Sequence, residues 1–109
     1  MGITKTEIFT AKQNKLANML KALAHPARIA IIQHLIKSEG CICGDLVEEL
    51  SLAQATISQH LKELKNIGII KGCTGGTSIS YCIDQKVWLQ VKKEFEAFFI
   101  AFRVKDECC

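Results

Sequence analysis

The most regular pattern of apolar and polar positions lies between residues 51 and 68, where it has the period of a helix. Ile57, Leu61 and Leu64 are spaced by four and three residues, so they predict one buried stripe. The opposite face carries short, amide-bearing or basic side chains: Ala55, Ser58, Gln59, Lys62 and Asn66. Such a face suits a helix lying in the major groove of DNA, because small residues permit close approach and amides and hydroxyls reach base edges and phosphates.

The same period predicts further helices on the N-terminal side of this stretch. We expect helices over residues 6–23, 26–38 and 44–50, and the DNA-facing helix then ends at Asn66, just before Gly68. Pro26 suits the first turn of the second helix and disfavours helix at the residue before it. Residues 44–67 therefore predict two short helices joined by a turn at residues 51–53.

Beyond Gly68 the period changes from that of a helix to that of strands. Residues 69–74 and 77–83 predict two strands around a Gly-Gly pair, which is typical of a β-hairpin. Mirroring about that pair places Cys73 opposite Ser78 and Cys82 opposite Ile69. The two cysteines are then not a cross-strand pair, and we interpret both as ordinary strand residues.

A last helix is predicted over residues 84–103. Its large apolar residues are spaced 3, 4, 3 and 4 apart, as in a coiled-coil seam: Trp88, Val91, Phe95, Phe98 and Phe102. A monomer of this size has little core left to cover such a stripe. We therefore expect a homodimer that forms through the first helix (residues 6–23) and the last helix (residues 84–103).

The predicted order is four helices, a hairpin and a helix, a mainly α chain of the order α-α-α-α-β-β-α. This is the order of a winged helix-turn-helix, in which residues 44–67 form the helix-turn-helix and residues 69–83 form the wing. At 109 residues, we expect residues 1–109 to fold as a single DNA-binding domain.

Composition narrows the class of protein. The chain has 14 Lys and Arg against 11 Asp and Glu, and this net charge of +3 is only a weak nucleic-acid signal. No apolar run reaches transmembrane length and no signal-peptide core is present, so we expect a cytoplasmic protein without a membrane partner. Six cysteines in that reducing setting favour metal binding or thiol chemistry over a disulfide framework. No phosphate loop, nucleophile motif or carboxylate pair indicates an enzyme.

Several blocks in the correct order resemble the ArsR/SmtB family of winged-helix repressors. The resemblance covers residues 14–84 and rests on residues 20–29 (Leu-Lys-Ala-Leu-Ala-His-Pro-Ala-Arg-Ile), 44–46 (Gly-Asp-Leu), 58–64 (Ser-Gln-His-Leu-Lys-Glu-Leu) and 68–70 (Gly-Ile-Ile). It implies a cytoplasmic homodimer that represses a palindromic double-stranded operator and releases it when an inducer binds. The resemblance also implies which residues contact DNA: Gln54, Thr56, Ser58, Gln59 and His60, to which Lys62 adds a phosphate contact.

The sequence departs from the family pattern in two places. Ala53 and Ala55 stand where relatives commonly carry Ser, which removes a capping hydroxyl and one polar contact. The wing tip lacks the Arg of many relatives, so that only Lys71 offers charge near the wing.

In arsenic-sensing relatives a Cys-x-Cys before the third helix binds trivalent arsenic, and the resemblance assigns this role to Cys41 and Cys43. Polarisable sulfur suits arsenite, As(III), or another thiophilic ion better than it suits hard cations. Because both cysteines lie one residue early in the family register, Cys43 has the alternative role of a small core residue. Cys108 and Cys109 are the further candidate metal ligands, with a tail outside the site as the alternative.

The sequence leaves other signals open. A bridge from Cys41 or Cys43 to Cys108 or Cys109 would make the same repressor a sensor of oxidants or reactive sulfur. A thiol-based metal carrier without a DNA function also accounts for the cysteines, although it does not account for the helix-turn-helix and wing. A zinc site on the last helix is disfavoured because His25, His34 and His60 all lie elsewhere.

Overall fold

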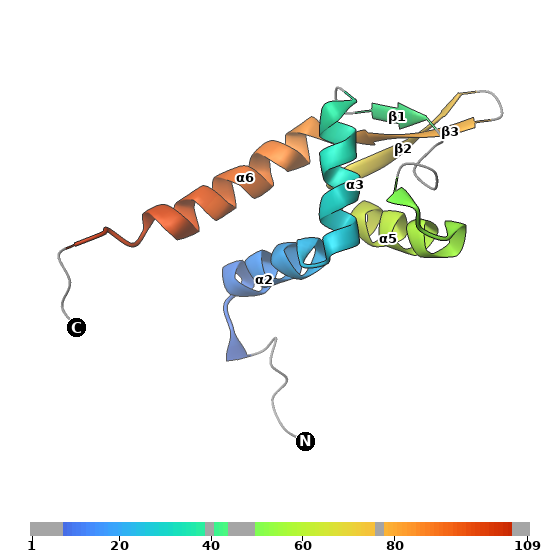
Figure 1. Cartoon of the computed structure of the whole chain (residues 1–109). Helices are drawn as coiled ribbons and strands as arrows, with labels where there is room; N and C mark the ends of the chain where they lie inside the picture. Colours follow the sequence, from blue (N-terminus) through green and yellow to red (C-terminus); the bar gives the residue numbers. More distant parts are fainter. Residues whose placement is uncertain (1–7, 39–40, 44–49, 76–77, 106–109) are drawn as a thin grey trace, which may run out of the picture.

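The computed structural model describes residues 8–38, 41–43, 50–75 and 78–105, of which strand residues 41–43, 73–75 and 78–79 are described by their backbone alone. Its elements are, in chain order, α2 (Ala11–Leu23), α3 (Pro26–Lys37), β1 (Cys41–Cys43), α5 (Gln54–Ile67), β2 (Ile70–Gly75), β3 (Ser78–Ile83) and α6 (Gln85–Ile100). The four helices and the hairpin confirm the predicted winged-helix architecture (Figure 1). The helix predicted over 44–50 lies outside the described residues except for Leu50, which is helical.

Local capping decides where the first of these helices begins. The Thr10 hydroxyl accepts a hydrogen bond from the Gln13 backbone N–H at 3.1 Å, and the Gln13 side chain accepts one from the Thr10 backbone N–H at 3.0 Å. This reciprocal arrangement is a capping box, which satisfies two otherwise orphaned donors. Helix α2 therefore begins at Ala11, and the prediction of one continuous helix over residues 6–23 was wrong, because Phe9 and Thr10 are not helical.

The sheet has three strands in the order β1-β3-β2, and both neighbouring pairs are antiparallel. In the hairpin, Cys73 pairs with Ser80 and Lys71 pairs with Cys82. The predicted pairing of Cys73 with Ser78 and of Cys82 with Ile69 was wrong by two residues, because the turn is centred on residues 76–77. The third strand, β1, was not predicted.

The core lies between α3, α5 and the sheet. Its fully buried side chains are Ile31 and Leu35 on α3, Ile57 and Leu64 on α5, and Ile69 before β2. Burying an aliphatic side chain of this size contributes about 1.5–3 kcal/mol. The core therefore fixes α5 against α3 and the hairpin.

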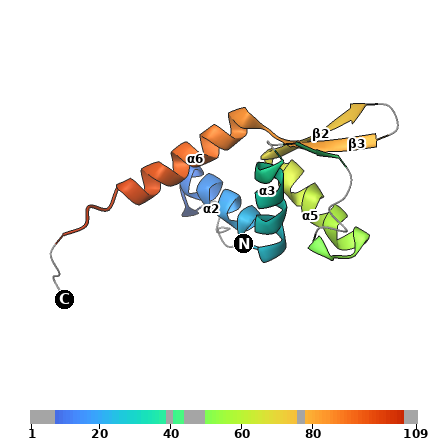
Figure 2. The same cartoon turned by 45° about the horizontal axis from the view of Figure 1, so that its top comes forward.

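The molecule is extended rather than round (Figures 1 and 2). The hairpin projects at one end, and the C-terminal half of α6 projects at the opposite end in both views. On α6, Val91 is buried and Trp88 and Phe95 pack against the core. Phe98 and Phe102, which complete the predicted seam, remain exposed at 58% and 74%. Across the described part of the chain, no helix has the length and apolar character needed to cross a membrane.

Candidate nucleic-acid interface and thiol positions

Helix α5 is limited by different features at its two ends. Ala53 occupies the N-cap position and provides no side-chain hydrogen bond, as the sequence predicted. At the other end Gly68 has a φ of 89°, in the left-handed region that favours glycine, and its N–H donates to the Lys65 carbonyl. The helix therefore ends firmly but begins without a side-chain cap.

One face of α5 is polar and exposed. The five exposed candidates for DNA contact are Gln54, Thr56, Ser58, Gln59 and Lys62. The amide of Gln54 donates to the Ser58 hydroxyl at 3.3 Å, and the amide of Gln59 donates to a Glu63 carboxylate oxygen at 3.1 Å. Both hydrogen bonds are exposed to solvent and join side chains four residues apart on the same helix. Because α5 is seated on the core, its exposed face is presented by a rigid element.

His60 does not belong to this exposed face. Its side chain is only 7% exposed, and its Nδ1 accepts a hydrogen bond from the Arg28 Nε at 3.1 Å. The assignment of His60 as a DNA contact is therefore corrected: its side chain joins α5 to α3. The periodicity contained this signal, because His60 is three residues after Ile57 and four before Leu64, on the same stripe.

A small polar cluster surrounds His60. The His25 ring lies 4.3 Å from the His60 ring, and the Arg28 guanidinium also donates to the Ala22 carbonyl at 3.1 Å. His25 additionally caps α3, since its Nδ1 accepts from the Ala27 N–H at 3.1 Å. Burial lowers the pKa of His60 below its usual 6.5, and the nearby His25 and Arg28 lower it further. The neutral ring is the form that can accept the hydrogen bond from Arg28.

The register of the sheet places four cysteines on one face. Cys41 pairs with Cys82, and Cys43 and Cys73 both pair with Ser80. Directly paired residues share a face, as do residues two apart on a strand. These positions alternate with Ile70, Tyr81 and Ile83, which pack into or against the core. The four cysteines therefore occupy the outer face, where Lys71 is exposed.

Cys82 is disulfide-bonded, so its interpretation as an ordinary strand residue was wrong. Its direct partner in the neighbouring strand is Cys41 on β1, about forty residues away, a pairing that local sequence patterns do not show. Cys41 and Cys43 lie on β1, directly before residues that the structure leaves undescribed. Cys108 and Cys109 fall outside the described residues. Among the side chains that are described, no group of three or more His, Cys, Asp or Glu could hold a metal ion.

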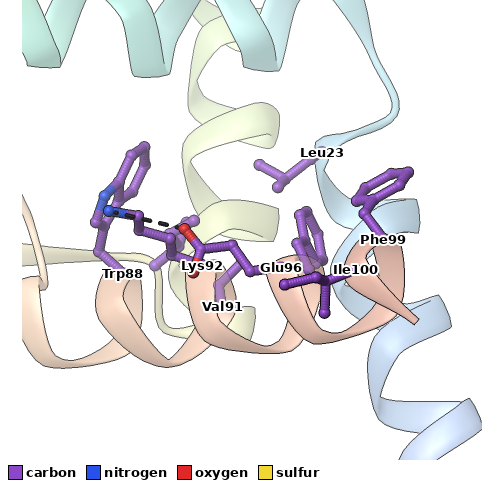
Figure 3. Close-up of a pocket in the computed structure, with 9 residues that line it drawn as sticks. Leu23, Trp88, Val91, Lys92, Glu96, Phe99 and Ile100 are labelled. Atoms are coloured by element: carbon purple, nitrogen blue, oxygen red, sulfur yellow. Dashed lines mark ion pairs between the residues drawn. The ribbon is translucent and has the colours of Figure 1, made fainter. Parts of the chain in front are cut away.

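An apolar groove of about 870 Å³ lies between α2 and α6 (Figure 3). Leu23 from α2 faces a row of large side chains from α6, and the groove is lined by Trp88, Val91, Phe95, Phe99 and Ile100. Lys92 and Glu96 form an exposed ion pair of 4.0 Å along it. The apolar seam predicted on the last helix thus packs against the core in its first half and is uncovered beyond Phe95.

Comparison with known proteins identifies the family. Residues 25–71 match the model for bacterial regulatory proteins of the arsR family. The chain is 37% identical over 78 residues to an uncharacterized HTH-type transcriptional regulator of Methanocaldococcus jannaschii, covering 70% of this chain and 86% of that protein. It is 36% identical over 93 residues to the cadmium resistance transcriptional regulatory protein CadC homolog of Staphylococcus aureus, covering 83% and 74%.

Other relatives are named as repressors. The HTH-type transcriptional repressor SmtB of Mycobacterium tuberculosis is 43% identical over 63 residues, or 58% of this chain, and the match spans only 46% of that repressor's length. Among solved structures, the transcriptional repressor BigR from Xylella fastidiosa aligns with a TM-score of 0.62 at 28% identity, over 94% of this chain and all of that one. These relatives are regulators rather than enzymes, and the chain belongs to the ArsR family of winged-helix transcriptional regulators.

Proposed function

We propose that this chain is a homodimeric repressor that binds a palindromic operator through α5 and releases it when a thiophilic ion binds its cysteines. The observation that carries the proposal is the exposed polar face of α5, seated on a rigid core beside the hairpin. A helix in the major groove needs such a face, because hydrogen-bonding side chains there read base edges. The relatives named as repressors support the same function.

The exposed residues of α5 divide into two roles. Gln54, Ser58 and Gln59 carry the neutral donors and acceptors that can read bases, whereas Lys62 supplies charge for phosphate. When DNA displaces the Gln59–Glu63 hydrogen bond, the amide of Gln59 becomes available to an adenine edge. Glu63 then loses its hydrogen bond from Gln59, so the contacts of Gln59 with DNA must offset the loss of that bond.

The exposed apolar end of α6 supports the homodimer. Phe98, Phe99, Ile100 and Phe102 are all more than half exposed and lie together at the end of the molecule away from the hairpin. An uncovered cluster of this kind is typical of an interface. Two copies joined there would carry two α5 helices related by a two-fold axis, which is the symmetry of a palindromic operator.

The inducer site is proposed at Cys41 and Cys43, with Cys108 and Cys109 as the further ligands. Cys41 and Cys43 are two residues apart on one face of β1. Thiolates prefer soft ions, so arsenite is the expected inducer. The cadmium-resistance relative supports a thiophilic ion in general. Since β1 precedes the helix-turn-helix closely, a change at β1 would alter the position of α5.

The DNA-binding part is tested by selecting duplexes from a randomised pool and measuring affinity for the selected sequence. Gln59→Ala should cost about 1–3 kcal/mol and relax preference at one position of each half-site. Lys62→Ala should weaken all sequences alike and reduce the salt dependence by about one ion. Gln90→Ala, on the exposed side of α6, is the matched control. Equal losses for Gln59→Ala and Gln90→Ala would contradict the proposed interface.

The inducer is tested by adding arsenite, Cd²⁺ or Zn²⁺ to the reduced protein bound to that duplex. Arsenite should release the wild type but not Cys41→Ser or Cys43→Ser. Linkage requires that bound operator weaken arsenite binding by the same factor by which arsenite weakens operator binding. An arsenite affinity that is unchanged by operator DNA contradicts the mechanism.

A further inference from the structure

On the outer face of the sheet, two cysteines that are far apart in the sequence lie opposite each other. Cys41 on β1 and Cys82 on β3 are direct partners in an antiparallel pair. We propose that these two residues form a reversible cross-strand disulfide, a redox modification site distinct from any bridge to the C-terminal cysteines.

The register selects Cys41 as the partner in the disulfide that Cys82 forms. On its other side Cys82 faces Lys71, which has no sulfur, and Cys73 faces Ser80. Direct cross-strand partners have Cβ atoms about 4.5–5.5 Å apart, whereas diagonal neighbours such as Cys43 or Cys73 lie roughly 7–8 Å away. A disulfide needs about 3.5–4.5 Å, which only a direct partner approaches.

Cys82 is accessible to a small oxidant. Cys82 is half-buried and alternates along β3 with Tyr81 and Ile83, which pack toward the core. The exposed Lys71 lies in the same row, which confirms that this row faces away from the core. A hydroperoxide can therefore approach from the solvent side without unfolding of the core.

The chemistry needs only a hydroperoxide. One thiolate attacks an oxygen of the peroxide, the O–O bond breaks, and the products are a sulfenic acid and an alcohol (water, when the oxidant is hydrogen peroxide). The second thiol then attacks the sulfenic sulfur, the S–O bond breaks, and water leaves as the S–S bond forms. Two thiols have lost two electrons and two protons to the peroxide. An external dithiol reverses the reaction by thiol–disulfide exchange.

The bridge has a consequence for signalling, which rests on the proposed function. An oxidised Cys41 has no thiolate to offer an arsenic ion, so the oxidised protein loses one proposed ligand. The same bond joins β1 to β3, and through them the segment before α5 to the strand that leads into α6. Oxidation would therefore set whether the repressor can respond to the ion.

Peptide mapping tests the bridge directly. Trypsin cleaves after Lys and Arg, so Cys41 and Cys43 fall in one peptide, residues 38–62, and Cys73 and Cys82 fall in another, residues 72–86. The double variant Cys43→Ser/Cys73→Ser leaves one thiol in each. After treatment of this variant with stoichiometric hydrogen peroxide, we expect the two peptides to be linked, and a phosphine reductant to separate them.

Matched variants decide the assignment. Adding Cys82→Ser to the double variant should abolish the linked species, whereas adding Cys108→Ser and Cys109→Ser should leave it unchanged. A link from either peptide to residues 106–109, or no link between residues 38–62 and 72–86, overturns the proposal. Circular dichroism of each variant shows that it is folded, so that loss of the link cannot be attributed to unfolding.

Arsenite binding separates this inference from the proposed function. The oxidised wild type should lose arsenite binding and regain it after phosphine reduction. Undiminished binding by protein whose bridge has been mapped contradicts the inducer site at Cys41, while the bridge itself stands. Release of operator DNA by arsenite in a protein that never forms the bridge supports the repressor and overturns the redox site.

Discussion

At the scale of single residues, Ala53 occupies the N-cap position of α5 but has no polar side chain to cap the helix. Its backbone has the extended N-cap conformation, with φ −64° and ψ 147°, yet no side chain caps α5. Ala53→Ser should place a hydroxyl where it accepts from a free backbone N–H of the first turn. We expect a gain of about 1 kcal/mol in the free energy of unfolding, measured with urea.

Ala55→Ser is the control for this change. Ala55 is also exposed but lies within the first turn of α5, where serine has a lower helix propensity than alanine. It should be neutral or slightly destabilising. Equal effects of the two substitutions would show that capping is not the cause.

We expect His60 to make the free energy of unfolding depend on pH. Its pKa is lowered in the folded protein, so the unfolded chain binds a proton more readily than the folded one. Stability from this group is complete above about pH 6.5, the unfolded value, and is lost as pH falls below it toward the folded pKa. We therefore expect the midpoint of urea unfolding to decrease as pH is lowered through this window.

His60→Gln tests whether His60 causes that dependence. The glutamine oxygen can accept from Arg28 but does not titrate, so the variant should show a flatter pH profile whatever its absolute stability. His34→Gln, on α3 outside the His25–Arg28–His60 cluster, is the matched control. It should keep the wild-type dependence of the urea midpoint on pH below about pH 6.5. Identical slopes for the wild type and His60→Gln would contradict the role given to His60.

At the scale of elements, the end of α5 depends on the conformation of Gly68. A Cβ at this position would lie 3.7 Å from a Val87 methyl, an ordinary contact, so space is not the constraint. The φ of 89° is the constraint, because it disfavours residues with a Cβ. Gly68→Ala should lower the free energy of unfolding by about 1–2 kcal/mol. Gly68→Asn should lose less, and an equal loss for both would indicate a packing effect instead.

The elements also show what sequence could and could not predict. The bounds of α3 and α5 and the start of α6 follow from periodicity and from local signals such as Pro26 and Gly68, which act within one turn. The last helix was predicted to end at residue 103, whereas α6 ends at Ile100, because the apolar spacing continues beyond the helix to Phe102. The predicted hairpin register was wrong because the turn is centred on residues 76–77 rather than on the Gly-Gly pair at 75–76, and symmetry about that pair is not a physical requirement. Strand β1 was not predicted because three residues are too few to show a period. Its formation also depends on a partner strand far along the chain.

The same distinction applies to the candidate site. The exposed polar face of α5 is a local property of one helix, so the sequence predicted which of its side chains are exposed, apart from that of His60. That error came from following the family alignment over the hydrophobic stripe. The role of Cys82 was inaccessible to local reasoning, since neither strand alone places it opposite Cys41.

At the scale of the whole molecule, the uncovered end of α6 and the hairpin lie at opposite ends (Figure 2). A dimer formed at the α6 end would leave both α5 faces and both hairpins free for DNA. Association through α6 therefore would not compete with operator binding. It would instead fix the distance between two recognition helices, which neither helix can do alone.

Phe98 provides the test of that arrangement. It is 58% exposed and lies edge-on to Phe99 at 5.4 Å, in the middle of the uncovered cluster. Phe98→Glu would bury a charge at the interface, so we expect a monomer in sedimentation velocity under conditions where the wild type is a dimer. Because Phe98 is largely exposed in the single chain, the variant should stay folded. Gln90→Glu adds the same charge to an exposed position of α6 outside the cluster and should remain a dimer.

The monomeric variant should also lose affinity for a two-half-site duplex far more than for a single half-site, because the linked second contact is lost. A wild type that sediments as a monomer, or a Phe98→Glu variant that stays dimeric, would show that this end of α6 is not the interface.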